Sequence, residues 1–380
     1  MNDNITSTQE AVADPNASSD PNTSPESDRE RVRTRNAVET DGGLDPGVGR
    51  NSPSEPGPAE TPPSGKPMDV PPEYRQEESV IEHRSLRSRV VQGLRDDKLA
   101  LFGAVVVVGF VLVAVFAPYV APYDPGATFG FMQSPDSYSQ ADLDGDGSIE
   151  RVWHPLGTDS FGYDVLSRII FGARVSLAVA LATVLVAFTI GTAIGLAAGF
   201  YGGWIDSVLM RYVDFQWAFP EIILGVAIIA FAGGRGVENV VIAIGIAYID
   251  DFARLIRGEV LSLREEEYVT AARAIGMSNR RIMTGEILPN AVAPLIVQAT
   301  LMIPLAILAE AGLSFLGLGV SPTTPTWGLL LSDGRQFISR AWWISVMPGI
   351  AIMLVVLAFN TLGDGLRDVF DVSDSEVEQR

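Results

Sequence analysis

Cysteine is absent from all 380 residues of the chain. This absence excludes disulfide bonds, thiolate metal sites and a cysteine nucleophile. Histidine is scarce, and the only two, His83 and His154, leave little for metal binding or acid–base catalysis near neutral pH. No G-x-x-x-x-G-K-[ST] motif occurs, because Gly65 and Lys66 are followed by Pro67. The chain therefore lacks the P-loop with which many proteins bind ATP.

Lysine is almost absent too, with Lys66 and Lys98 as the only examples among 27 basic residues. The formal net charge is −19. An acidic, arginine-rich and lysine-poor chain is typical of an organism adapted to high salt, such as a halophilic archaeon, although a GC-rich genome also favours arginine. Such a charge argues against nucleic acid as a partner.

The first 82 residues differ in composition from the rest. They hold 17 acidic and 7 basic side chains and half of the 24 prolines, among serine, asparagine, threonine and glycine. A segment of this kind cannot bury enough apolar surface to offset its ordering entropy. It has no apolar core typical of a secretory signal peptide. We predict a disordered, acidic cytoplasmic tail over 1–82.

Long apolar windows dominate the remainder. A bilayer core of about 30 Å needs roughly 20 apolar residues per helix, and six windows are read as spans. They cover 99–120, 175–200, 204–232, 240–249, 291–313 and 344–362. The sequence therefore predicts an all-α protein of a cell membrane with six transmembrane helices.

Arginine placement predicts the orientation. Five basic residues between 84 and 98 precede the first window, and six arginines lie between 254 and 281. Basic residues concentrate on the cytoplasmic side of membranes. With six spans both regions fall on that side, so both termini are expected in the cytoplasm and the loops 121–174 and 314–343 outside.

Three predicted spans contain glycine or proline residues that affect how the helices pack or bend. Gly191, Gly195 and Gly199 share one helical face, which favours either close helix packing or a moving gate surface. Pro220 and Pro304 interrupt apolar helices, either as simple kinks or as broken helices that line a pathway.

The segment 259–290 is charged and helix-favouring. It reads as one helix, a turn at Gly276, and a second helix from about 278 to 288 that Pro289 ends. An apolar stripe along the first helix is suited to a groove on a partner protein. A helix lying along the lipid interface is the alternative.

Within this segment, Ala271-Ala272, then Gly276, then Leu288-Pro289 resemble the EAA loop of binding-protein-dependent ABC importer permeases. Two positions depart from that pattern, since Thr270 replaces a glutamate and Glu286 replaces an isoleucine. Three further segments, 154–177, 307–328 and 360–371, resemble the C-type second permease of the dipeptide, oligopeptide and nickel branch. We expect an N-terminal segment with the first span and an outer loop over 84–153, the importer domain with five helices over 154–371, and a cytoplasmic tail over 372–380.

The resemblance implies a type I importer fold and no enzyme activity in this chain. It implies three kinds of partner besides the lipid bilayer: a homologous second permease, two ABC ATPase subunits, and an extracellular substrate-binding protein. Di- or oligopeptides are the implied cargo, with nickel chelates or another small solute as alternatives. The residues expected to dock on the ATPase are Tyr268, Ala271, Ala272, Arg273, Gly276, Met277, Leu288 and Pro289.

Two carboxylates fall within spans. Glu221 follows Pro220, and Glu310 lies near the outer end of the fifth window. Because a charge at membrane depth costs roughly 2.5 kcal/mol or more, these residues are candidate pathway groups that would bind the amino terminus of a peptide. Structural hydrogen bonds to a neighbouring helix are the alternative.

The outer loop contains a partial calcium-loop pattern. The spacing of its acidic residues suits a Ca²⁺ loop, but Trp153 stands where the last bidentate glutamate belongs, which leaves Asp159 or no residue as the final ligand. A solvated turn explains the same residues. The expected ligands are Asp142, Asp144, Asp146, Ser148 and Glu150; no other cofactor is expected.

Two other functions fit part of the pattern. An ion-coupled secondary transporter would also use spans and Glu221, without an ATPase. An intramembrane protease is suggested by Ser314 two residues after Gly312, but no histidine lies in any predicted span to activate it.

Overall fold

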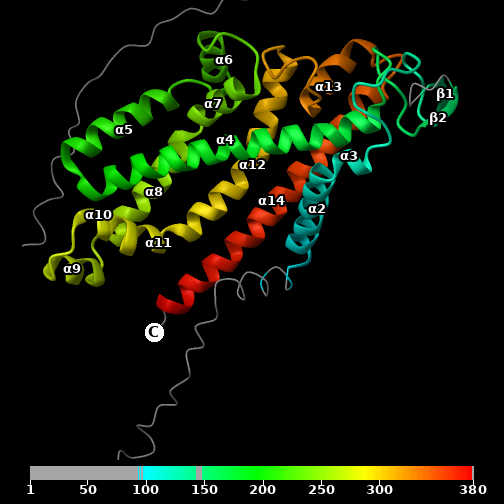
Figure 1. Ribbon diagram of the computed structural model, residues 1–380. Coiled ribbons are helices and arrows are strands. Elements are labelled where there is room, and N and C mark those ends of the chain that lie inside the picture. Colours follow the sequence, from blue (N-terminus) through cyan, green and yellow to red (C-terminus); the bar gives the residue numbers. More distant parts are fainter. Residues whose placement is uncertain (1–92, 94, 96, 143–147, 379–380) are drawn as a thin grey trace, which may run out of the picture. The chain divides into compact units, whose positions relative to one another are not determined.

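The computed structural model describes residues 93, 95, 97–142 and 148–378, with side chains up to residue 370. The predicted tail over 1–82 lies outside this part of the chain. Figure 1 shows helices throughout, with one small pair of strands at one end. The elements are α2 (Lys98–Val115), α3 (Ala117–Val120), β1 (Ser137–Ala141), β2 (Glu150–His154), α4 (Val165–Tyr201), α5 (Gly203–Trp217), α6 (Glu221–Phe231), α7 (Val237–Ala247), α8 (Ile249–Leu263), α9 (Glu267–Ala274), α10 (Asn279–Ile282), a π-helical turn (Met283–Ile287), α11 (Leu288–Asn290), α12 (Val292–Phe315), α13 (Trp327–Gly334), a 3₁₀ turn (Arg335–Phe337) and α14 (Trp343–Glu378).

Four described helices are long and apolar enough to cross a membrane: α2, α4, α12 and α14. They correspond to the first, second, fifth and sixth predicted spans. α4 begins ten residues before the predicted window, where Asp164 caps it by accepting a hydrogen bond from the Ser167 N–H. α14 extends past the predicted end, so the expected tail over 372–380 is helical as far as Glu378.

The third predicted span is a bent pair. α5 and α6 together are long and apolar enough, but their axes differ by 96° across residues 218–220. Pro220 cannot donate a backbone hydrogen bond, which explains why the helix stops there. The total is five if the pair is counted as one broken span, and four if it is a re-entrant loop.

The fourth predicted span is present as two helices. α7 has only 11 residues, about 16 Å at 1.5 Å per residue, and a break at Tyr248 separates it from α8. Gly245 of α7 lies against Val186 of α4, and Gly191 of α4 lies against Ile249 of α8. The two helices thus follow α4 in turn along its length. The count of six spans stays a prediction.

The glycines of α4 permit this packing. A Cβ on Gly191 would lie 2.6 Å from the Ile249 carbonyl oxygen, and one on Gly199 would lie 2.8 Å from the Val260 Cβ. Backbones approach this closely only where one side chain is missing. The stripe therefore packs α4 against α8, which was one of its two expected roles.

A small β-hairpin amends the all-α prediction. β1 and β2 pair antiparallel, with Ser139 opposite Val152 and Tyr138 opposite Trp153. Alternating side chains of the hairpin are buried, as in a strand with one covered face. The guanidinium of Arg151 lies 3.9 Å from the centre of the Tyr138 ring across the pair. We call the described residues between 121 and 164 the outer cap, after the side of the membrane that the sequence predicts for them.

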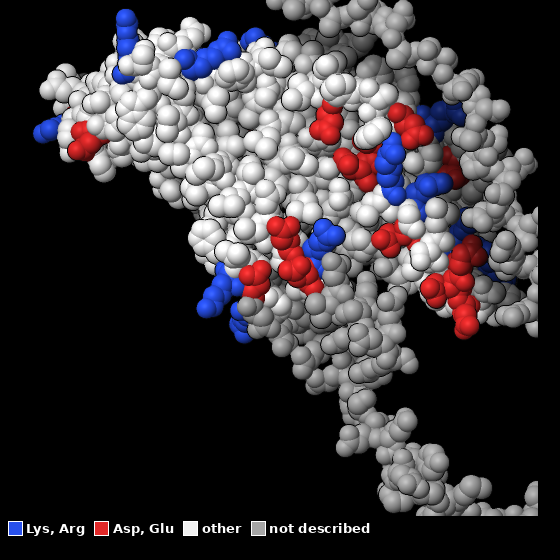
Figure 2. All heavy atoms as spheres, turned by 180° about the vertical axis from the view of Figure 1, so that it is seen from behind, with Lys and Arg blue, Asp and Glu red and all other residues white. Residues whose placement is uncertain are grey.

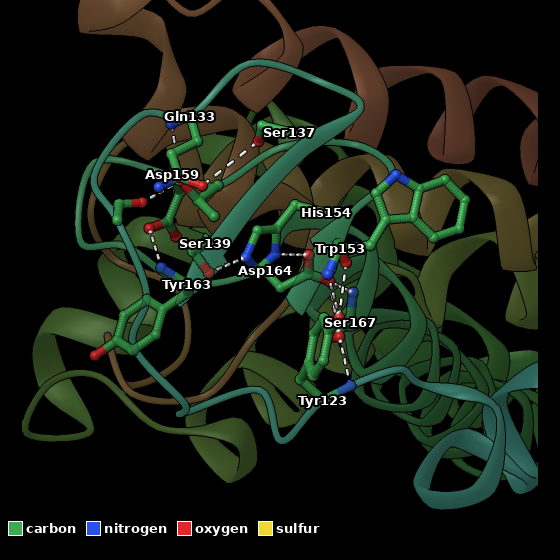
Figure 3. A network of polar contacts seen from close by, with 12 residues as sticks. Tyr123, Gln133, Ser137, Ser139, Trp153, His154, Asp159, Tyr163, Asp164 and Ser167 are labelled. Atoms are coloured by element: carbon green, nitrogen blue, oxygen red, sulfur yellow. Dashed lines mark hydrogen bonds and ion pairs between the residues drawn. The ribbon is translucent and has the colours of Figure 1, made fainter. Parts of the chain in front are cut away.

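A buried polar network fixes the outer cap to α4 (Figure 3). His154 Nδ1 lies 2.9 Å from Asp164 Oδ1, and its Nε2 lies 2.8 Å from Ser139 Oγ. Asp159 Oδ2 accepts from Arg168 Nη1 at 2.7 Å, and both side chains are almost fully buried. Every member of this network has a partner, so it stabilises the cap as a rigid unit.

Charged side chains are unevenly placed on the face seen in Figure 2. They gather toward the two ends, and the broad area between is uncharged. Exposed apolar side chains are expected of a protein whose middle faces lipid. Those of the helices include Leu101, Val105, Leu185, Phe215, Leu305 and Leu357.

Candidate coupling loop and translocation pathway

The segment 259–290, called here the coupling loop, is a set of short helices. α8 ends at Leu263, and Arg264 to Glu266 separate it from α9, so the single first helix that the sequence predicts is broken. Glu266 adopts an extended conformation, and Glu267 begins α9, where the helix dipole favours an acidic side chain. Gly276 has φ +80°, a left-handed conformation that favours glycine, and it forms the predicted turn.

The second half of the loop is less regular than a single helix. α10 passes into a π-helical turn over Met283–Ile287 and then into α11, which includes Pro289. The proline lies in the first turn of α11, where its missing N–H is tolerated. The helix is interrupted two residues later, at Ala291, before α12 begins.

The expected docking residues divide into an exposed and a buried group. Ala272 is only 6% exposed and packs with Val269 in the main apolar core, and Leu288 contacts the same core. These two hold the loop in place. The others are exposed or partly exposed: Tyr268, Ala271, Arg273, Gly276, Met277 and Pro289.

The apolar stripe of α9 is therefore divided. Val269 and Ala272 face the protein's own core, whereas Ile275 is 79% exposed next to Gly276. A single exposed apolar side chain is ordinary on a protein surface, so docking of a partner at this end of α9 stays a prediction.

Polar contacts connect the coupling loop, together with Arg257 just before it, to three spans. Arg264 Nη1 donates to the Gly199 carbonyl at the end of α4 at 2.9 Å. Arg257 makes a two-pronged ion pair with Asp206 of α5, at 2.6 and 2.7 Å. Asn290, which leads into α12, donates to the Tyr268 hydroxyl at 3.4 Å. Partial burial raises the pKa of Tyr268, so this hydroxyl keeps its proton.

These contacts link α9 to the start of α12 through Tyr268 and Asn290, and the residues just before α9 to α4 through Arg264. Planar, bidentate pairing makes the Arg257–Asp206 contact directional. Arg273 adds a weaker contact, with its guanidinium 5.4 Å from the centre of the Phe200 ring.

Glu310 is held inside the chain. Its side chain is fully buried, and its two carboxylate oxygens accept from Ser314 Oγ at 2.7 Å and Ser176 Oγ at 3.4 Å. Ser176 Oγ also accepts from the Trp327 N–H at 3.2 Å. The carboxylate thus joins α12 to α4 and, through Ser176, to α13, which is the alternative given for it. Ser314, the residue that suggested a protease, is occupied by this contact.

A second serine has catalytic-looking neighbours. Ser139, His154 and Asp164 have the hydrogen-bond order of a Ser-His-Asp triad. However, Ser139 is 8% exposed and His154 is fully buried, and Asp164 Oδ2 is occupied by the N–H and Oγ of Ser167. A substrate carbonyl has no access to Ser139 Oγ, so the arrangement is a structural support for the cap.

Glu221 and Pro220 stand at the bend between α5 and α6. Glu221 is exposed and begins α6. Their roles in a pathway remain predictions, and the surroundings are treated below.

The calcium hypothesis falls largely outside the described residues. Asp144 and Asp146 belong to the part that the structure does not describe, while Asp142, Ser148 and Glu150 flank it between β1 and β2. Both carboxylate oxygens of Asp159 accept hydrogen bonds within the protein: Oδ2 accepts from Arg168, and Oδ1 accepts from the backbone N–H groups of Phe161 and Tyr163. The calcium site stays a prediction without Asp159.

Comparison with known families assigns most of this architecture. Residues 191–373 match the model of the binding-protein-dependent transport system inner membrane component. Residues 85–141 match the N-terminal transmembrane domain of oligopeptide transport permease C. The dipeptide transport system permease protein DppC of Alkalihalophilus pseudofirmus is 44% identical over 73% of this chain and 87% of its own length. The chain belongs to this permease family.

Other relatives of the permease give the same result. The di/tripeptide transport system permease protein DppC of Pseudomonas aeruginosa is 44% identical over 74% of this chain and 90% of its own length. The glutathione transport system permease protein GsiD of Escherichia coli is 41% identical over 73% of this chain and 87% of its own length. The resemblance stated from the sequence is therefore confirmed, and the chain is a membrane-embedded subunit of an ABC importer. The high-salt origin stays a prediction.

A solved structure is similar to part of the permease. An inward-facing MetNI methionine ABC transporter chain gives a TM-score of 0.45 at 20% identity, covering 53% of this chain and 96% of that chain. Membership of the family implies ATPase and substrate-binding-protein partners in general.

Three residues in or beside the coupling loop have partners that no local sequence pattern identifies: Arg257, Arg264 and Asn290. Their partners, Asp206, Gly199 and Tyr268, lie between 22 and 65 positions away. The one available signal was the amphipathic pattern of α8, which places Arg257 beside the span before it.

Proposed function

We propose that this permease forms half of a translocation pore for di- or oligopeptides. The observation that supports this proposal is that three relatives at 41–44% identity are named for dipeptides, di/tripeptides and glutathione. All three names describe short peptides or a peptide derivative. Nickel chelates and other small solutes are the alternative cargo.

The pore would be completed by a homologous second permease. Two ABC ATPase subunits would bind on the cytoplasmic side, and an external binding protein would deliver the cargo. Both termini would lie in the cytoplasm, as the arginine-rich regions before α2 and around α9 predict. ATP hydrolysis would take place on the ATPase chains, with none on this one.

The coupling loop would be the surface on which the ATPase acts. ATP binding would close the ATPase pair and move α9. The contacts of Tyr268, Arg264 and Arg257 would then shift α12, α4 and α5 between inward and outward access. Only a difference in binding energy between two states of the complex drives such a change.

The experiment is reconstitution of the permease with the second permease, the ATPases and the binding protein in liposomes. We expect ATP-dependent uptake of a labelled dipeptide that stops when either the ATPase or the binding protein is left out. Uptake of a nickel chelate with no peptide uptake would contradict the peptide assignment. Peptide uptake driven by an ion gradient without the ATPases would contradict the importer mechanism.

A further inference from the structure

Two helix breaks lie side by side in this permease. α5 ends at Trp217 and the chain bends by 96° into α6, while α7 ends at Ala247 and resumes as α8 at Ile249. A cavity of about 350 Å³ lies where they meet. Small-ligand pockets in proteins range from about 300 to 1,000 Å³. Its walls include Gln216, Trp217, Pro220, Glu221, Ala247 and Asp250.

Gln216 joins the two breaks. Its Nε2 donates to the Ala247 carbonyl at 3.1 Å and to Asp250 Oδ1 at 3.2 Å. Because both partners are acceptors, they fix which end of the amide is nitrogen. Gln216 is 5% exposed, and among the described residues its Oε1 has no hydrogen-bond partner. A buried acceptor without a donor is costly, so this oxygen calls for a donor from outside the chain.

The charge around the cavity is negative. Glu221 and Asp250 line it, and Asp251 repels both electrostatically. Arg254 is the cation that acts on the two aspartates, but Asp214 already holds it at 3.0 Å. The cluster therefore keeps an excess of carboxylates in a part of the protein where charge is expensive.

The ends of two helices add to the negative electrostatic potential in the cavity. The C-termini of α5 and α7, at Trp217 and Ala247, carry the negative ends of two helix dipoles and both lie on the cavity wall. Glu221 and Asp250 lie in the first turns of α6 and α8, where the positive ends favour the ionised carboxylates. Paired broken helices with this polarity suit a cation at membrane depth.

From these observations we infer that the cavity binds the α-ammonium group of a peptide in transit. A primary ammonium offers three N–H donors, one for Gln216 Oε1 and one for each of the carboxylates of Glu221 and Asp250. The ring of Trp217, which is 71% exposed, already has the guanidinium of Arg254 5.2 Å from its centre, so the ammonium is assigned to Gln216, Glu221 and Asp250 alone. This inference rests on the proposed peptide cargo. It makes the cavity an intermediate binding site on the transport pathway that recognises the amino terminus of the peptide.

Transport by the reconstituted complex gives the first test. The probes are a dipeptide with a free amino terminus and the same dipeptide with that nitrogen replaced by hydrogen. The binding protein is present in excess, and the peptide concentration is varied. Glu221→Gln with Asp250→Asn is expected to lower kcat/KM for the free-amine peptide by about 10- to 100-fold, the range for a lost charge-assisted hydrogen bond. Uptake of the deaminated analogue should stay unchanged. Glu238→Gln, on the first turn of α7 and outside the cavity, is the matched control.

Thiol labelling gives a second test that needs no transport. The chain has no cysteine, so Ala218→Cys, on the exposed part of the cavity wall, introduces one thiol. The rate of labelling is measured with a cationic trimethylammonium methanethiosulfonate and with an anionic sulfonate methanethiosulfonate. The ratio of the cationic rate to the anionic rate should be about tenfold higher at Ala218→Cys than at Ser207→Cys, which lies on α5 and serves as the control. The ratio should fall to the control value in the Glu221→Gln, Asp250→Asn background. The free-amine dipeptide should slow the cationic reagent, and its N-acetylated form should not.

The outcomes separate the inference from the proposed function. Absence of peptide uptake by the wild-type complex contradicts the proposed function, whatever the labelling shows. Peptide uptake that the double variant lowers equally for both probes overturns the inference alone. Equal slowing of labelling by sodium ions and by the dipeptide identifies a site for inorganic cations and also overturns it.

Discussion

The two ends of the permease are built in opposite ways. At the outer end, the cap closes its polar groups on themselves, with His154, Asp164, Asp159 and Arg168 all buried and paired. At the inner end, the coupling loop leaves Ile275 79% exposed beside Gly276 and depends on partly exposed contacts. The cap thus satisfies its buried charged groups within the described residues, whereas the coupling loop leaves a large apolar side chain exposed.

The largest expected effect lies at the inner end. Gly276→Arg should abolish association with the ATPase and leave membrane insertion intact. Any side chain at φ +80° strains the turn, and an arginine adds bulk where a glycine Cβ would meet nothing within 4 Å. Pull-down of the ATPase by the purified permease measures the effect.

Gly276→Asn is the matched control for that variant. Asparagine tolerates the left-handed conformation better than other residues, so most of the association should return. If the arginine variant binds the ATPase as the wild type does, Gly276 is not at the docking surface.

The outer end gives the next effect in size. Asp159→Asn removes the charge that pairs with Arg168, whose side chain is 4% exposed, and should lower the free energy of unfolding by about 3–5 kcal/mol. The thermal midpoint of the purified complex in detergent measures it, and ATPase association per folded molecule should not change.

An inner ion pair supplies the comparison. Glu265→Gln removes the partner of Arg264, but Glu265 is 75% exposed, so the expected loss is below about 1 kcal/mol. Similar losses for the two variants would contradict the view that the outer end is rigid through burial.

The packing between the ends gives a smaller effect. Gly195→Ala places a Cβ against the Ala253 carbonyl and Ile256, which should force α4 and α8 apart at about 1–3 kcal/mol. Gly109→Ala in α2 is the control, because nothing lies within 4 Å of its new Cβ. There alanine should be neutral or slightly stabilising. A loss at Gly109 equal to that at Gly195 would count against close packing.

The sequence predicted the same contrast only in part. Hydropathy placed the long spans well, because about 20 apolar residues are a strong signal. The short α7 was harder, since a break at Tyr248 and the charges Asp250, Asp251, Arg254 and Arg257 in α8 limit the apolar window there to 240–249. The turn at Gly276 was predicted because its signal is local in the sequence.

What the sequence could not predict depends on long-range contacts. The hairpin of the outer cap pairs residues 137–141 with 150–154, and alternation over five residues is too short a signal beside long helices. Ala272 belonged to the expected docking surface, yet it is buried, because the side of α9 that faces the core is fixed only by its packing. The cavity at Gln216 joins two breaks about 30 positions apart, which no single motif contains.

The smallest expected effect concerns how the inner end transmits motion. Tyr268→Phe removes the hydroxyl that accepts from Asn290 and should cost about 0.5–1 kcal/mol of contact between α9 and α12. We expect ATP hydrolysis by the complex to continue while fewer peptides are transported per ATP. Tyr201→Phe is the matched control, because its ring packs on Phe200 and, among the described residues, its hydroxyl makes no hydrogen bond. If both variants keep the wild-type ratio of peptide to ATP, motion does not pass through Tyr268 and must reach the spans through Arg264 and Arg257.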